Sequence, residues 1–174
     1  MASATAAAKS PVWRGLDPLA GDETRLLLLG SFPGRASLKA GQYYGHPQNQ
    51  FWRLLGETMQ LPLSASSYER RLDLLRSEGV GLWDVITSAQ REGSLDSSIR
   101  DPEISDLHAL LDRLPRLRAI GFNGATAARI GRKRLGPRGV NYRLVDLPSS
   151  SPAYTLAYGA KLARWMELRE EKAN

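Results

Sequence analysis

The stretch Arg25-Leu26-Leu27-Leu28-Leu29 runs directly into Gly30-Ser31-Phe32-Pro33-Gly34, so a short apolar run is followed at once by a tight, glycine-rich turn. A continuous apolar run of this length is typical of a β-strand that is buried on both faces. Strands of that kind occur in parallel sheets that are covered by helices. The segment therefore predicts an α/β fold whose first strand lies at residues 25–29.

Three further apolar runs have the length of a strand, and the segments between them are long enough for crossover helices. The pattern indicates a three-layer α/β/α sandwich around a central, mainly parallel four-stranded sheet. The later strands are predicted at residues 80–86, 117–122 and 142–147. The predicted helices cover residues 68–77, capped by Ser66 or Ser67 and ended by Gly79; 103–114, opened by Asp101 and Pro102; the stretch from near Asn123 to before Gly136; and about 155–172.

The chain has 174 residues, which is the length of one domain. We expect residues 1–10 to form a disordered leader and residues 11–174 to form a single domain. No apolar run approaches the ~20 residues that span a bilayer, so we expect a cytoplasmic protein of the bacterial or archaeal cytosol or nucleoid, with no membrane partner. A monomer is the simplest assembly for such a domain.

The cysteine and histidine content limits the chemistry that the chain can perform. It has no cysteine, which excludes disulfides, thiolate zinc sites, iron-sulfur clusters and cysteine nucleophiles. Its two histidines, His46 and His108, stand in dissimilar contexts and are too few for the usual zinc ligand sets. We therefore expect neither a metal nor another cofactor.

The charge balance favours a polyanionic partner. The chain carries 24 Lys and Arg against 18 Asp and Glu, a net charge of +6. Basic residues cluster at 129–143, and within this cluster Arg132 and Arg134 are the candidates for contact with DNA phosphates. The same cluster is equally compatible with a solvated helix end and loop.

In a parallel sheet, ligand sites form beyond the carboxyl ends of the strands, so the loops after the strands are the informative ones. The first of these lacks both the G-x-G-x-x-G pattern of dinucleotide sites and the Gly-Lys-Ser/Thr ending of a P-loop. It is followed by residues 43–52, which hold four aromatic side chains, a histidine, two glutamines and an asparagine in ten positions. A simple connecting loop has no need of so many aromatic and polar side chains, so this segment is a candidate part of the functional site.

Further polar residues follow the other strands: Asp84, the segment 91–96, and the segment 123–127. The last loop contains three consecutive serines at 149–151 just before a predicted helix. Their hydroxyls and free backbone N–H groups could bind a phosphate, although an ordinary serine-rich turn and helix cap is the better interpretation of that loop taken alone.

Six short motifs occur in a fixed order along the chain: GSFPG (30–34), YYGHPQNQFW (43–52), WDV (83–85), REGSLD (91–96), FNG (122–124) and LPSSSPA (147–153). In this order they resemble the uracil-DNA glycosylase superfamily, and within it the branch of hypoxanthine-DNA (deoxyinosine) glycosylases. The resemblance implies a monofunctional DNA glycosylase of base excision repair. Such an enzyme hydrolyses the N-glycosidic bond of a flipped deaminated base, hypoxanthine or uracil, and leaves an abasic site.

The resemblance also implies roles for individual residues, with one departure from the wider superfamily. Phe32 stands where relatives carry an asparagine or aspartate that acts on the attacking water, and Asn49 matches the residue thought to take over that role. Tyr44 matches the aromatic that stacks on the flipped base. The resemblance further implies that the base pocket is lined by Ser31, Phe32, Pro33 and Gly34. It implies that the DNA backbone is contacted by Ser149, Ser150 and Ser151, and that the minor groove lies near Pro152 and Ala153.

Two assignments stay open from the sequence. Asp84 contacts the base, assists the water or simply caps a loop, and His46 stabilises the leaving base or bonds to backbone. The partner implied is double-stranded DNA with a deaminated base, with single-stranded DNA as a second candidate. Two alternatives are a damaged-DNA binding module that has lost catalysis and a Rossmann-like hydrolase of free nucleosides.

Overall fold

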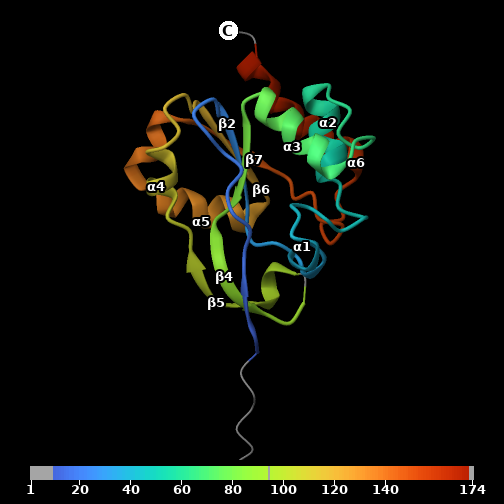
Figure 1. Cartoon of the computed structure of the whole chain (residues 1–174), viewed down its shortest axis with the longest axis vertical. Helices are drawn as coiled ribbons and strands as arrows, with labels where there is room; N and C mark the ends of the chain where they lie inside the picture. The colour runs from blue at the N-terminus through green and yellow to red at the C-terminus, as the bar shows by residue number, and fades with distance from the viewer. Residues whose placement is uncertain (1–9, 94, 173–174) are drawn as a thin grey trace, which may run out of the picture.

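A computed structural model describes residues 10–93 and 95–172 of the chain (Figure 1). The predicted leader lies outside the described residues except for Ser10, whose hydroxyl donates a hydrogen bond to Glu92. Within the described ranges, every helix is too short or too polar to cross a bilayer.

The centre of the molecule is a four-stranded parallel sheet in the order β3-β2-β6-β7. This confirms the predicted sheet and its four strands. The order places β2 and β6 in the middle, where both of their edges are paired, and this position agrees with their continuous apolar sequences. The strands are β2 (Leu26–Gly30), β3 (Val80–Asp84), β6 (Ala119–Asn123) and β7 (Arg143–Leu147).

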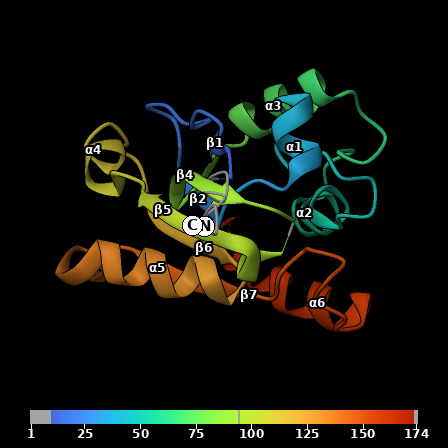
Figure 2. The ribbon, with the colours of Figure 1, turned by 90° about the horizontal axis from the view of Figure 1, so that it is seen from below.

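Helices cover both faces of this sheet, because alternate side chains of each strand point to opposite faces. In β2, Leu26 and Leu28 belong to one buried cluster, whereas Leu27 and Leu29 belong to the other. Two views show the resulting layers on either side of the strands (Figures 1 and 2). The first cluster packs against α2 (Phe51–Met59), α3 (Tyr68–Ser77) and α6 (Tyr158–Trp165), and the second against α4 (Leu107–Leu111) and α5 (Ala125–Leu135).

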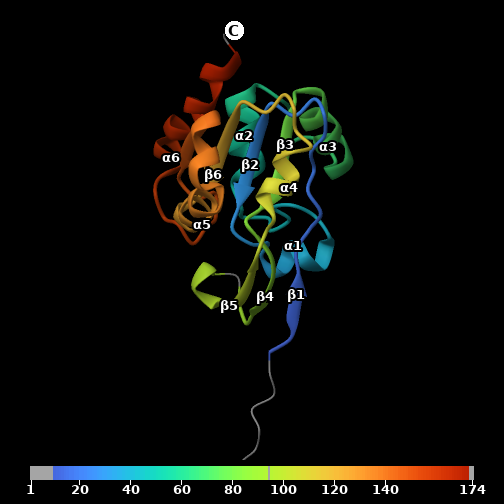
Figure 3. The ribbon, with the colours of Figure 1, turned by 90° about the vertical axis from the view of Figure 1, so that its left-hand side faces the viewer.

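A second, antiparallel sheet extends from the carboxyl end of the first (Figure 3). Its order is β1-β4-β5, with β1 (Val12–Arg14), β4 (Ile86–Arg91) and β5 (Ile99–Ile104). The predicted strand at 80–86 is therefore two strands, because the chain leaves the parallel sheet after Asp84 and enters β4 at Ile86. The antiparallel sheet was not expected from the sequence.

The helix predicted at 103–114 is wrong at its start. Asp101 and Pro102 lie in β5, the edge strand of the antiparallel sheet, where a proline is tolerated because one side of the strand has no partner. The register shifts between Ser88 and Gln90, and Asp101 has a φ of +47°, so the strand bulges there. The helix begins only at Leu107, capped by the Asp106 side chain.

The other predicted helices are present with adjusted ends. The predicted α3 has the expected bounds, with Ser67 as its cap, and α5 lies within the predicted stretch. The last helix begins three residues later than expected, at Tyr158, and continues after Trp165 as a 3-10 helix. The helices α1 (Arg35–Ala40) and α2 lie in a segment for which the sequence predicts no helix. Short 3-10 helices are η1 (Asp96–Ser98), η2 (Gly136–Asn141) and η3 (Met166–Lys172).

Candidate active site

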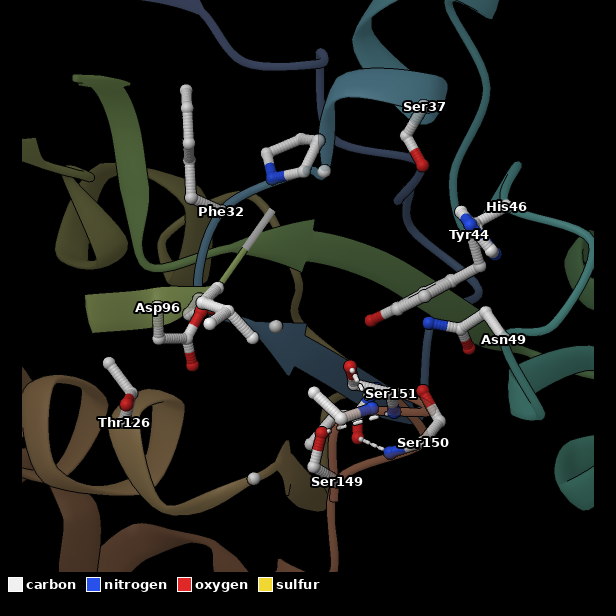
Figure 4. Close-up of a pocket in the computed structure, with 18 of the residues that line it drawn as sticks. Phe32, Ser37, Tyr44, His46, Asn49, Asp96, Thr126, Ser149, Ser150 and Ser151 are labelled. Carbon is white, nitrogen blue, oxygen red and sulfur yellow. Dashed lines mark hydrogen bonds between the residues drawn. The ribbon is translucent and has the colours of Figure 1, made fainter. Parts of the chain in front are cut away.

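The loops after all four parallel strands meet around a cavity of about 490 Å³. The cavity lies at the carboxyl ends of the strands, where open α/β sheets bind their ligands, and its size suits a small organic molecule. Figure 4 shows how the side chains converge on it from separate segments. The residues of the predicted site that line it are Ser31, Phe32, Pro33, Gly34, Tyr44, His46, Asn49, Asp84, Ser149, Ser150, Ser151, Pro152 and Ala153.

The first loop is held in place by a buried arginine from β4. The guanidinium of Arg91 donates hydrogen bonds to the carbonyl oxygens of Phe32 and Pro33, at 3.2 and 2.6 Å. The Phe32 ring packs into the apolar core and lies 5.6 Å from the same guanidinium. The loop therefore presents mainly its backbone to the cavity, together with Ser31, whose hydroxyl donates to Asp96 at 2.7 Å.

Tyr44 combines a strained backbone with an unusual side-chain position. Its φ is +53°, a conformation that residues with a Cβ rarely adopt. One face of its ring stacks on Phe51 with centroids 3.7 Å apart, so only the other face is open to a ligand. Its hydroxyl points into the cavity (Figure 4) and lies near the Asn123 side chain, but this contact lacks the geometry of a hydrogen bond. Stacking of a base on the open face stays a prediction.

Asn49 is oriented by the start of α2. Its Oδ1 accepts a hydrogen bond from the backbone N–H of Phe51 at 2.9 Å, and this contact also assigns the two ends of the amide. An amide oxygen has two lone pairs, so Oδ1 can accept a second hydrogen bond from a water in the cavity. The amide nitrogen faces the hydroxyl of Tyr44 (Figure 4).

His46 lies at the mouth of the cavity with an exposed side chain. Its Nδ1 lies 3.1 Å from the backbone N–H of Gln48, which donates to it. In the neutral ring the proton must then be on Nε2, which makes that atom a hydrogen-bond donor. The backbone contact that the sequence left open is thus present, and it leaves the second ring nitrogen available for a ligand.

Asp84 ends β3 at the floor of the cavity and is only 5% exposed. Its Oδ2 has no hydrogen-bond partner. Burial raises the pKa of this carboxyl to about 7; Arg91 acts in the opposite direction and Asp96 adds to the rise. The group therefore changes its charge near neutral pH, which is uncommon for an aspartate.

The serine-rich loop after β7 is fastened to β6 through its middle serine. Asn123 donates from Nδ2 to the Ser150 hydroxyl and accepts from the Ser150 N–H, both at 2.9 Å. Ser150 is 1% exposed, so its side chain holds the loop on β6, which differs from the predicted DNA contact. Ser149 and Ser151 form turns in which their hydroxyls accept backbone N–H groups of the same loop. Phosphate contacts by these two serines stay a prediction.

A buried lysine from α6 connects two of the loops. Lys161 is 1% exposed, and its ammonium donates to Gln50 Oε1 at 3.0 Å and to the carbonyl oxygen of Ser151 at 3.2 Å. The backbone N–H of Gln50 also donates to the carbonyl oxygen of Ser150. These contacts fix the loop that carries Asn49 against the serine-rich loop.

Arg132 and Arg134 do not line the cavity. They lie in the last turn of α5, whose first residue is at the cavity, and Arg134 is about 14 Å along the helix from that point. The Arg132 guanidinium contacts Asp146 at 3.0 Å. The structure therefore brings neither arginine to the site, and a DNA contact by them stays a prediction.

Several residues that hold the site together were not predicted from the sequence. Arg91 and Asn123 were within quoted motifs, but nothing in the sequence distinguished a buried anchor from a solvated side chain. The burial of Lys161 was even less apparent from the sequence, because a single charge on the buried face does not visibly change the pattern of an amphipathic helix. In the described part of the chain, no group of three His, Asp or Glu side chains is placed to hold a metal ion.

The fold and the sequence are similar to those of known proteins. The sequence model of the uracil DNA glycosylase superfamily matches residues 18–171. A hypoxanthine DNA glycosylase of Methanosarcina acetivorans is 43% identical over 140 residues, which are 80% of this chain and 87% of that protein. One of Methanosarcina barkeri is 38% identical over 154 residues, 88% of this chain and 96% of that protein.

The folded structure has a close counterpart as well. An NMR structure from Methanosarcina acetivorans superposes with a TM-score of 0.82 at 37% identity, covering 94% of this chain and all of the other. Its description assigns it provisionally to the uracil DNA glycosylases.

Proposed function

The chain belongs to the uracil DNA glycosylase superfamily, and on that premise we propose that it excises hypoxanthine, and uracil as a second substrate, from double-stranded DNA. The reaction is hydrolysis of the N-glycosidic bond, and it leaves an abasic site. The names of the two Methanosarcina relatives support hypoxanthine as the main base. Uracil is included because both bases present the same lactam, a C=O beside an N–H. We place the enzyme in the cytosol with the chromosome, as a monomer.

Bond cleavage leaves positive charge on the sugar and negative charge on the departing base, so a glycosylase needs a positioned water on one side and hydrogen-bond donors on the other. The C1′–N bond breaks with its electron pair on the base. The water oxygen bonds to C1′, and the proton that water gives up is taken up by the released base.

Asn49 is the residue to which we assign the water. Phe32 cannot perform this role, because its ring is apolar and 6% exposed. Asn49 lines the same cavity, its amide is held by the Phe51 N–H, and its oxygen keeps an accepting lone pair. A neutral amide positions water without acting as a strong base. This placement is the observation that carries the proposed mechanism.

The remaining roles follow from position around the cavity. His46 offers an Nε2–H at the mouth, where it can donate to the departing base. Ser149 and Ser151 stand on the rim together with Pro152 and Ala153, and we assign them to the DNA backbone and the minor groove beside the flipped nucleotide.

The test is a single-turnover assay on duplexes that contain one deoxyinosine or one deoxyuridine, followed by alkaline cleavage of abasic sites. We expect cleavage of the inosine duplex and weaker cleavage of the uracil duplex. Free inosine and uridine serve as the comparison in the same buffer. Cleavage of the free nucleosides alone would indicate a nucleoside hydrolase, and binding of both duplexes without cleavage would indicate an inactive damage-recognition module.

A further inference from the structure

Two buried polar groups at the floor of the cavity lack hydrogen-bond partners. They are the Oδ2 of Asp84 and the hydroxyl of Tyr44. Buried polar atoms in folded proteins are almost always paired, so an unpaired group in a binding cavity indicates that a ligand supplies the partner. Neither group was needed for the water-positioning step assigned to Asn49.

The two groups approach the same point of the chain. A Cβ built on Gly30 would lie 2.5 Å from Asp84 Oδ1 and 2.9 Å from the Tyr44 hydroxyl oxygen. Asp84 comes from the end of β3 and Tyr44 from the loop before α2, so the glycine at the end of β2 gives both side chains room to converge. The Asp84 carboxyl and the Tyr44 hydroxyl therefore lie close together at the end of β2, in the lining of the same cavity.

The surroundings of Asp84 favour the uncharged acid. Its carboxyl is buried beside Tyr43 and Tyr44, and the charged groups that face it are Arg91 from β4 and Asp96 from η1. Arg91 directs its Nη1 to the carbonyl oxygens of the first loop, and its Nη2 lies 3.9 Å from Asp96. Burial raises the pKa of Asp84 to about 7, and it also raises the pKa of Tyr44, which keeps its proton.

We propose that Asp84 acts as a neutral carboxylic acid that, together with the Tyr44 hydroxyl, binds the lactam of the flipped base and stabilises the charge that departs with it. The inference rests on the proposed glycosylase function. The acid donates to the lactam oxygen and accepts from the lactam N–H, and the same oxygen has a second lone pair for Tyr44. In this arrangement Tyr44 contacts the base through its hydroxyl, which replaces the face-to-face stacking expected from the sequence.

The same acid complements the lactam edge of a deaminated base and the amino–imine edge of its parent, because either carboxyl oxygen can carry the proton. The role proposed for Asp84 and Tyr44 is therefore to bind the flipped base and to stabilise the departing charge, and other contacts must set the preference for deaminated bases. Asp84 stabilises the departing anion by donating a hydrogen bond, and it keeps its proton throughout the reaction.

The experiment measures single-turnover cleavage of the inosine and uracil duplexes as a function of pH for the wild type, Asp84→Asn, Asp84→Ala and Tyr44→Phe. The scan runs from about pH 5 to about pH 8.5, below the ionisation of the lactam N–H itself. The wild-type rate should fall about tenfold per pH unit above a midpoint near 7, because only the neutral acid donates.

The variants distinguish the effect of the hydrogen-bonding pattern at position 84 from the effect of the titrating proton. An asparagine also offers one donor and one acceptor but does not titrate, so Asp84→Asn should stay within about tenfold of the wild-type plateau and lose the alkaline decline. Asp84→Ala should lose on the order of 10² to 10³ in rate, and Tyr44→Phe about 10-fold on both duplexes. Glu103→Gln, an exposed carboxylate outside the cavity, is the matched control and should keep the wild-type profile.

The assay distinguishes failure of the glycosylase function from failure of the role of Asp84. If the wild type cleaves neither duplex, the glycosylase function itself is wrong. If the wild type cleaves but its profile is flat across the range, or if Asp84→Asn keeps the alkaline decline, the role of Asp84 is refuted while the function stands. Folding of each variant is confirmed by thermal melts at both ends of the pH range.

Discussion

At the scale of single residues, the site is built from side chains whose surroundings change their ordinary chemistry. Asp84 is an acid that burial keeps protonated up to near neutral pH. Asn49 is a neutral amide whose orientation is fixed by a backbone N–H. Ser150, which the sequence suggests as a phosphate contact, is buried and makes two hydrogen bonds with Asn123. The neighbours of each residue decide its role more than its type does.

The protonation of Asp84 has a consequence for stability that is independent of catalysis. Its folded-state pKa is raised from 3.8 to about 7, so between these values the folded chain holds a proton that the unfolded chain has released. This contribution to stability is complete below the unfolded pKa and is lost as the pH rises through the folded pKa. Up to about 1.4 kcal/mol per pH unit is lost across this window.

Asp84→Asn removes this titration and should therefore gain stability relative to the wild type as the pH rises from about 4 to about 7. Urea unfolding of both proteins at several pH values measures the difference in free energy of unfolding. Taking the difference cancels the other titrating groups, which both proteins share. A difference that stays constant with pH would show that the Asp84 carboxyl is already ionised in the folded state.

At the scale of elements, two buried cations hold the loops of the site. Arg91 on β4 binds the carbonyl oxygens of the first loop, and Lys161 on α6 joins the loop that carries Asn49 to the serine-rich loop. Buried charges that are bound in this way are costly to remove, because their partners are left without donors. The loops are thus positioned by the helix and strand next to them.

Replacing Lys161 with alanine should lower the free energy of unfolding by about 2 to 4 kcal/mol, because Gln50 Oε1 and the Ser151 carbonyl lose a charged donor. The cleavage rate should fall as well, since the two loops lose their common anchor. Arg164→Ala, on the same helix but with an exposed side chain, is the control and should cost no more than about 1 kcal/mol. Equal losses in the two variants would argue against the anchoring role.

The elements also show how far the sequence was informative. The four strands were predicted because runs such as Leu26–Leu29 are buried on both faces, and α3 was predicted because Ser67 and Gly79 mark its ends. The helix start at Pro102 was wrong, since the same residue suits an edge strand and only the pairing of β4 with β5 decides between them. The antiparallel sheet depends on pairing between distant segments, which local patterns do not encode.

At the scale of the whole molecule, the parallel sheet brings four separate loops to one edge, and the antiparallel extension adds Arg91 and Asp96 to the cavity. The cavity membership of Asn49, Asp84 and His46 could be anticipated from the rule that ligands bind at strand ends. The roles of Asn123 and Lys161 could not, because each depends on a contact between segments that are far apart in the sequence.

The arrangement predicts a monofunctional enzyme that leaves the DNA strand intact. A lyase needs an amine nucleophile in the cavity. Burial lowers the pKa of Lys161, but its ammonium is turned to Gln50 and Ser151, and Lys39 is exposed. Borohydride should therefore trap no covalent complex with an inosine duplex. A trapped species that disappears in Lys39→Ala or Lys161→Ala would overturn this prediction.

Metal independence is a second property of the whole site. The proposed chemistry uses an amide, a carboxyl and an imidazole, and no group of three ligating side chains occurs among residues 10–93 and 95–172. Cleavage should proceed at an unchanged rate in excess EDTA. Loss of activity on chelation, with recovery on addition of Mg²⁺ or Zn²⁺, would contradict the mechanism.

The central claim is that Asn49 positions the attacking water in place of the residue replaced by Phe32, and single-turnover cleavage by Asn49→Ala and Asn49→Asp tests it most directly. Asn49→Ala should cleave slower by on the order of 10² to 10³, about 3 to 4 kcal/mol of transition-state stabilisation, with DNA affinity nearly unchanged. Asn49→Asp keeps an acceptor for the Phe51 N–H and for water, so it should fold and retain part of the activity. A folded Asn49→Ala that cleaves at the wild-type rate, while His46→Ala is inactive, would contradict the claim and move catalysis to His46.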